Sequence, residues 1–326
     1  MTAVELPGLV RRAIEFDGVT RDVYVAGTGP AVIVMHEIPG LHPGVLAFAA
    51  RLRALGLTTY LPSLLGTPGR AMTGPYTARS IARACVAREF ATWATGHGSP
   101  IVDWMRQLAA LAHRECGGPG VGAIGMCLTG GFALGMMVDD RVIAPVLSQP
   151  SLPFAVTGAQ KAAIGLDAAA CARIAARTDV PVLGLRFTHD RMVPPERFAT
   201  LRDLLGDRFI GVEIDSGPGN PHGIGRMAHA VLTHDLVDRP GHPTRAALDQ
   251  VGILGVLDQR QAGTAWEQFL SFCLEPDVYL TPFSNPYTVN TLSGAGYPVS
   301  PNNYIGELWG RYRGAVTNDI SAAAFQ

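Results

Sequence analysis

Residues 121–131 constrain the fold of this chain more than any other segment, and they read Val-Gly-Ala-Ile-Gly-Met-Cys-Leu-Thr-Gly-Gly. An apolar run reaches Gly125, a single cysteine follows among small residues, and a helix-like stretch begins at Phe132. This order predicts a buried strand, a sharp turn and a helix. The N-terminus of that helix favours the thiolate form of Cys127. The segment alone fits both a catalytic nucleophile and a buried structural cysteine. Catalytic partners elsewhere in the chain would favour the first of these two roles for Cys127.

Apolar runs alternate with amphipathic stretches over most of the first 260 residues. Two alternating runs within residues 13–26, joined at Asp17-Gly18, predict an opening hairpin. The further predicted strands are 31–35, 57–61, 141–147, 180–187 and 208–215, and the further predicted helices are 43–55, 77–116 with a break at 96–100, 158–177, 195–206 and 244–260. At the break, Ser99 and Pro100 have the residue types of a helix start. This alternation predicts an α/β fold with a mainly parallel twisted sheet and helices on both faces.

Three chemically active side chains directly follow predicted strands, namely Glu37, Cys127 and Asp190. Active sites of open α/β sheets lie at the carboxyl ends of the strands, so we expect these side chains to meet. A cysteine nucleophile needs a base, and that base needs an orienting carboxylate. Asp190 is the candidate for the carboxylate.

Composition restricts the partners and the compartment. The chain has 326 residues, 48% of them hydrophobic, and a net charge of −1, so neither nucleic acid nor an anionic membrane is an expected partner. The five cysteines are scattered without a C-x-x-C pair, and the N-terminus lacks the blocks of a signal peptide, which favours the cytoplasm. Residues 117–138 carry no charge and are long enough to span a bilayer, but their glycines favour the strand, turn and helix.

A metal site is not expected. His36, Glu37 and His42 form an H-E-x-x-x-x-H pattern, which is longer than the motif of zinc proteases. Pro39 and Gly40 would also break the helix that such a motif needs. We expect no metal and no other cofactor.

Three segments are similar to one known family. They are 32–40 (Val-Ile-Val-Met-His-Glu-Ile-Pro-Gly), 125–131 (Gly-Met-Cys-Leu-Thr-Gly-Gly) and 188–194 (Thr-His-Asp-Arg-Met-Val-Pro). Over about residues 20–258 the chain resembles the dienelactone hydrolase family. The resemblance implies the α/β-hydrolase fold and the hydrolysis of a small ester or lactone through a thioester acyl-enzyme.

The resemblance also implies roles for particular residues. Cys127 and Asp190 would belong to a Cys-His-Asp triad, and Glu37 would interact with the resting thiol. The backbone N–H groups of Leu128 and Ile38 would form the oxyanion hole. In α/β-hydrolases the chain order is nucleophile, acid and histidine, and this chain keeps that order.

Two histidines compete for the triad position. His222 lies 32 residues after Asp190, which is the more usual spacing, whereas His229 lies 39 residues after it. His229 is followed by Ala230 and Val231, and the family commonly has a small and an apolar residue at these positions. We therefore predict His229 as the base and keep His222 as the alternative.

The chain departs from the family pattern at two places. Thr129 stands where the family usually has glycine, which predicts a less tight turn or a hydroxyl that contacts the substrate. The arginines that hold a substrate carboxylate in the family have no clear match, although Arg83 and Arg88 lie in the corresponding stretch. Arg88, Thr129 and His222 are therefore the candidate substrate-binding residues.

The last 66 residues form the least interpretable part of the chain. We predict a hydrolase domain over residues 1–260 and an aromatic-rich C-terminal extension over residues 261–326, which holds 11 of the 24 aromatic residues. The extension is expected to pack on the domain, over the mouth of the active site, or on a second subunit in a homodimer. A second interpretation is a non-catalytic relative that binds a small molecule or partner, with Cys127 as a redox-sensitive thiol.

Overall fold

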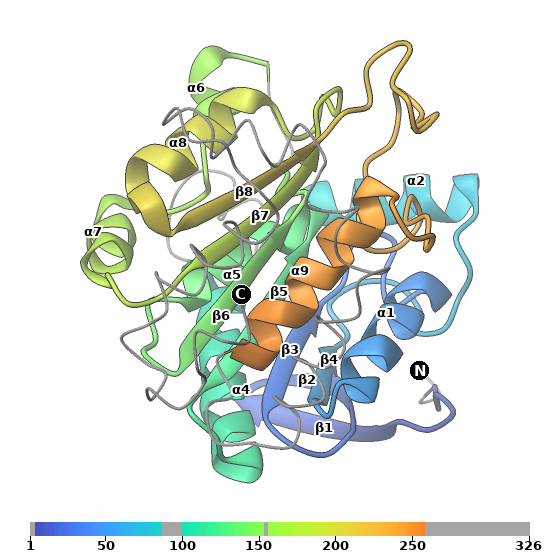
Figure 1. The fold of residues 1–326 in the computed structure, drawn as a ribbon. Coiled ribbons are helices and arrows are strands. Elements are labelled where there is room, and N and C mark those ends of the chain that lie inside the picture. The colour runs from blue at the N-terminus through green and yellow to red at the C-terminus, as the bar shows by residue number, and fades with distance from the viewer. Residues whose placement is uncertain (1–3, 87–98, 153–155, 258–326) are drawn as a thin grey trace, which may run out of the picture.

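The computed structural model describes residues 4–86, 99–152 and 156–257, without the side chains of 83–86 and 253–257 (Figure 1). The predicted extension at 261–326 and a dimer through it lie outside the described residues. So do Arg88 and most of the predicted break at 96–100. The boundary at 260 and the cytoplasmic location stay predictions. None of the described helices is both long and apolar enough to cross a bilayer.

Eight strands of the described chain form one twisted sheet in the order β1-β2-β4-β3-β5-β6-β7-β8 (Figure 1). The strands are β1 (Val10–Phe16), β2 (Val19–Ala26), β3 (Ala31–Met35), β4 (Thr58–Pro62), β5 (Val121–Met126), β6 (Val142–Ser148), β7 (Val182–Phe187) and β8 (Phe209–Ile214). The β1–β2 and β2–β4 pairs are antiparallel, and the other pairs are parallel. The mainly parallel sheet predicted from the sequence is confirmed.

The opening hairpin is also confirmed. Strand β1 pairs with β2 from Phe16 and Val19 outward. The two residues between them, Asp17 and Gly18, have φ values of 51° and 75°. Positive φ at both positions is the geometry of a type I′ turn, whose twist matches that of the paired strands.

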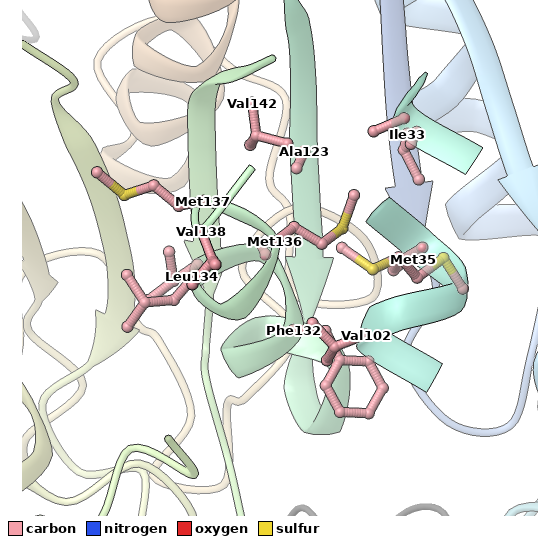
Figure 2. Close-up of a cluster of buried hydrophobic side chains, with 14 of the residues drawn as sticks. Ile33, Met35, Val102, Ala123, Phe132, Leu134, Met136, Met137, Val138 and Val142 are labelled. Atoms are coloured by element: carbon pink, nitrogen blue, oxygen red, sulfur yellow. The ribbon is translucent and has the colours of Figure 1, made fainter. Parts of the chain in front are cut away.

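Helices cover both faces of the sheet. They are α1 (Pro43–Ala54), α2 (Gly74–Val86), α4 (Pro100–Cys116), α5 (Gly130–Met136), α6 (Gly158–Ala162), α7 (Ala168–Ala176), α8 (Pro195–Leu205) and α9 (Pro243–Leu257), with short 3-10 helices at Cys127–Thr129 and Gly206–Arg208. Helices α1 and α9 bury apolar side chains on one face, and α4, α5, α7 and α8 do so on the other. Figure 2 shows part of the core beneath α4, α5, α7 and α8, where Phe132 and Met136 of α5 lie near Met35 of β3. Because both faces are covered, every residue of β3 and of β7 is buried.

One predicted helix is wrong. The alanine-rich segment 158–177 forms two helices, α6 and α7, in place of one. Gly165 between them has a φ of 79°, and the Asp167 side chain caps α7 by accepting from the Ala170 N–H at 2.7 Å. A glycine with positive φ follows the first helix, and the N-cap residue after it starts a second one, although the segment has a high helix propensity. By contrast, Ser99 and Pro100 occupy the N-cap and first positions of α4, as predicted.

Candidate active site

Cys127 lies on the sharp turn between β5 and α5. Its φ of 57° is a strained conformation for a residue with a side chain, and it is 5% exposed. A Cβ atom on Gly125 would lie 2.0 Å from the Thr129 carbonyl oxygen, and one on Gly130 would lie 2.6 Å from Cα of Pro150. These close approaches require glycine at both positions, so the tight turn can form only with glycine at 125 and 130.

The Thr129 hydroxyl bonds backbone groups of its own turn and of β3, and its role in substrate binding stays a prediction. Its side chain is buried, and its hydroxyl accepts from the Met126 N–H at 2.9 Å. The hydroxyl also lies 2.9 Å from the carbonyl oxygens of Met35 and Met126, to which it can donate. The turn is therefore not loosened by the missing glycine, because the hydroxyl ties it to the end of β3.

The structure brings His229 and Asp190 together. His229 Nδ1 lies 2.6 Å from Asp190 Oδ2, and the Met192 N–H donates to Asp190 Oδ1 at 2.9 Å. The loop that carries the histidine is held by Asp235, whose Oδ2 accepts from the N–H groups of His229 and Ala230 at 2.8 and 2.9 Å. Sequence reasoning missed Asp235, and no motif marks it.

The other ring nitrogen of His229 faces Cys127. Within the described chain, His229 Nε2 is buried and makes no hydrogen bond. Burial lowers the pKa of His229, but its interactions with Cys127 and the hydrogen bond to Asp190 outweigh this effect, and the pKa lies well above its ordinary value.

His222 does not share this position. It is exposed, and its ring packs edge-on against His242 with centroids 5.3 Å apart. Neither oxygen of Asp190 accepts a hydrogen bond from it among the described residues. His242 itself is 2% exposed, and its Nδ1 lies 2.7 Å from the Thr244 hydroxyl at the start of α9.

Glu37 is buried in a hydrogen-bond network that does not include the thiol. Its Oε1 accepts from His42 Nε2 at 3.0 Å and from the Thr233 hydroxyl, and its Oε2 accepts from Gln149 Nε2 at 3.0 Å. Burial raises the pKa of Glu37, but these donors outweigh it and hold the pKa below its ordinary value. Among the described residues, no hydrogen bond joins Glu37 to Cys127, which differs from the contact that the resemblance implies.

Gln149 connects the Glu37 loop to the histidine loop, and sequence reasoning missed it. It follows β6 with a φ of 37° and is fully buried. Its Oε1 accepts from the Val231 N–H at 3.3 Å while its Nε2 donates to Glu37. The available signal was its place directly after a predicted buried strand, where a polar side chain points to the same edge as Cys127.

His36 and His42 have structural partners. His36 Nε2 accepts from the N–H groups of Leu64 and Leu65 at 3.0 and 3.3 Å, and its Nδ1 donates to the Glu37 carbonyl oxygen. His42 Nδ1 accepts from the Gly44 N–H at 3.1 Å, so its proton sits on Nε2, which faces Glu37. Both rings thus fix the loop that carries Glu37 and Ile38.

Burial makes His36 a source of pH-dependent stability. Burial lowers the pKa of His36 to about 4, so between about pH 6.5 and pH 4 the unfolded chain binds a proton that the folded chain does not. The free energy of unfolding should therefore fall with falling pH, by up to about 1.4 kcal/mol per unit from this group. Urea unfolding of wild type and His36→Gln across this range should show a shallower slope in the variant. Equal slopes would contradict the prediction.

The two expected oxyanion-hole amides are placed at the turn and on the β3 loop. The Ile38 N–H has no acceptor among the described residues. Leu128 follows Cys127 at the start of a helical segment, where the first N–H groups have no partner within the helix. Of the candidate arginines, the side chain of Arg83 and the whole of Arg88 lie outside the described residues.

The fold and the site together define the class of protein. A sheet of this order, with a cysteine on a tight turn after β5, an aspartate after β7 and a histidine after β8, is an α/β-hydrolase. The chain belongs to the dienelactone hydrolase family, whose sequence model matches residues 19–272. It is accordingly a hydrolase that acts on ester bonds.

Solved structures with a similar fold include a dienelactone hydrolase from Anabaena variabilis, at 17% identity and a TM-score of 0.48, with 78% of this chain and 100% of that chain covered. A dienelactone hydrolase-like promiscuous phosphotriesterase from metagenomic libraries is 17% identical, with a TM-score of 0.49 and coverage of 76% and 98%. No curated protein matches the chain.

Proposed function

We propose that Cys127, His229 and Asp190 form a catalytic triad that hydrolyses a small ester or lactone through a thioester. One observation carries the proposal. His229 bonds Asp190 at 2.6 Å through one ring nitrogen and presents the other, buried and unbonded, to Cys127. A base held by a carboxylate and aimed at a nucleophile is the arrangement that nucleophilic catalysis needs.

In acylation, the Cys127 thiolate attacks the carbonyl carbon, and the electron pair of the carbonyl bond moves to the oxygen. The N–H groups of Leu128 and Ile38 stabilise this oxyanion, and such donors are typically worth about 3 kcal/mol each. When the intermediate collapses, the alkoxide leaves with the proton from His229 Nε2. For a lactone the leaving alcohol stays attached to the acyl group.

In deacylation, neutral His229 takes a proton from water, and the hydroxide attacks the thioester carbon. Collapse of the second intermediate expels the Cys127 thiolate and releases the acid, which restores the thiolate–imidazolium pair. Glu37 acts through its charge, because the buried carboxylate and the imidazolium attract each other. A thiolate is a good leaving group, so activated esters and enol lactones suit this site better than amides.

The acyl-enzyme gives a direct test. The protein is mixed with an activated acetate ester, quenched in acid within one turnover, and digested for mass spectrometry. An acetyl group should appear on the peptide that contains Cys127 and disappear on longer incubation. Hydrolysis of the ester with no acyl group on Cys127 at any time would reject the proposed mechanism.

A further inference from the structure

The Cys127 sulfur has a neighbour that no motif predicts. Ser151 Oγ lies 3.1 Å from Cys127 Sγ, and Ser151 is 3% exposed. Among the described residues, the sulfur is the hydroxyl's one hydrogen-bond partner. A serine hydroxyl has one proton to donate, whereas a thiolate can only accept. If the sulfur is ionised, the hydroxyl must therefore be the donor.

The surrounding backbone holds Ser151 in this position. The Ser151 N–H donates to the Cys127 carbonyl oxygen at 3.0 Å, so the same two residues are joined through main chain and side chain. Pro150 packs closely on Gly130, because a Cβ atom added to Gly130 would lie 2.6 Å from the Cα atom of Pro150. The loop that carries Ser151 therefore packs against the turn at residues 125–130 in the absence of substrate.

A buried arginine fixes the same loop to the loop of Asp190. Arg197 is 1% exposed, and its Nη1 donates to the carbonyl oxygens of Pro150 and Met192 at 3.1 and 3.0 Å. Ser151 also lines a small pocket with the apolar side chains of Leu134 and Leu152. Hydrogen bonds to a charged atom strengthen in such surroundings, because water does not compete for it.

Among the described residues, Glu37 makes no hydrogen bond to the Cys127 sulfur. His42 and Thr233 occupy Oε1, and Gln149 occupies Oε2. The resting sulfur is instead placed between the Ser151 hydroxyl and the His229 ring.

We propose that Ser151 is a further catalytic residue, whose hydroxyl donates a hydrogen bond to the Cys127 thiolate in the resting enzyme. The nucleophile is then ionised before substrate binds, with its proton on His229 Nε2. In acylation the sulfur loses its charge to the new C–S bond and the hydrogen bond weakens. In deacylation the bond forms again as the thiolate leaves. This role rests on the proposed function of Cys127.

The rate of alkylation of Cys127 by iodoacetamide, measured as a function of pH, tests the role without any ester. Peptide mass spectrometry separates Cys127 from the other four cysteines. In wild type the midpoint should lie well below about 8.5, the value of a free thiol. In Ser151→Ala it should rise by about one unit, with about tenfold slower alkylation at pH 6. Ser151→Thr, which keeps the hydroxyl, should stay near the wild-type midpoint.

Thr58→Val is the matched control. It removes another buried hydroxyl, which donates to the Gly29 carbonyl oxygen at the opposite edge of the sheet. Its midpoint should equal that of wild type. Thermal unfolding shows whether each variant is folded, and Ser151→Gly replaces Ser151→Ala if the latter is not.

The outcomes separate the two proposals. A midpoint unchanged by loss of the Ser151 hydroxyl, or a wild-type midpoint near that of a free thiol, would overturn the role of Ser151. An absent acyl group on Cys127 during ester hydrolysis would instead reject the proposed function, whatever the alkylation midpoint.

Discussion

Replacement of Cys127 by alanine is expected to lower kcat for an activated ester by about 10⁴- to 10⁶-fold, because no other group at the turn can form the acyl-enzyme. The sulfur is the one nucleophilic atom that both the His229 ring and the Ser151 hydroxyl approach among the described residues. Alanine is smaller and fits the same backbone, so the fold should remain. Steady-state hydrolysis of an aryl acetate measures the effect.

The same variant should change His229 in a measurable way. The interactions with Cys127 raise the pKa of His229 in the wild type, and alanine removes them. NMR titration of the histidine ring protons should therefore show a lower pKa of His229 in Cys127→Ala. Cys171→Ala, on the surface helix α7, is the control and should keep wild-type activity and titration. Full activity in Cys127→Ala would contradict the cysteine mechanism.

Replacement of His229 by alanine is expected to lower kcat by a similar factor of about 10⁴ to 10⁶. The variant loses the proton donor for the leaving alkoxide and the base for water. It also leaves the Asp190 Oδ2, which lies 2.6 Å from the ring in the wild type, without that partner. Added imidazole should restore part of the activity, because the vacated space is that of the ring.

His222→Ala is the matched comparison for His229→Ala. His222 is exposed and contacts His242 by its ring edge, so its loss should change stability by no more than about 0.5 kcal/mol and leave kcat near the wild-type value. Both variants are assayed with the same ester at equal concentration of folded protein. A large loss of kcat in His222→Ala, with activity retained in His229→Ala, would show that His222 and not His229 is the catalytic base.

The positions of the chemically active residues along the chain follow from local sequence. The strand before Cys127, the glycines around it and the helix after it are determined by neighbouring residues, because a turn this tight excludes a Cβ at 125 and 130. The strand before Glu37 is a continuous apolar run, and the strand before Asp190 is apolar except for Arg186, which is the pattern of strands covered on both faces. Strand ends in a parallel sheet meet at one edge, so their convergence could be predicted as well.

Hydrogen-bond partners could not be predicted in the same way. The family resemblance implies a contact between Glu37 and the resting thiol, but in the structure the carboxylate bonds Gln149, 112 residues away, and Thr233, 196 residues away. The Thr129 hydroxyl, expected as a substrate contact, bonds the end of β3, 94 residues away. Such partners depend on which loops lie side by side, and no local pattern records that.

Local sequence thus predicts the strand, the cysteine turn and the helix, and it places an ordered set of polar residues at the ends of parallel strands. Local backbone sterics and hydrophobic patterning act over a few residues, so a linear reading captures them. Three contacts follow only from the packing of distant loops: His229 with Asp190, Glu37 with His42, and Ser151 with the Cys127 sulfur. Those contacts depend on hydrogen-bond distances of a few ångströms between loops that are distant in the chain, which are set only when the whole sheet has formed.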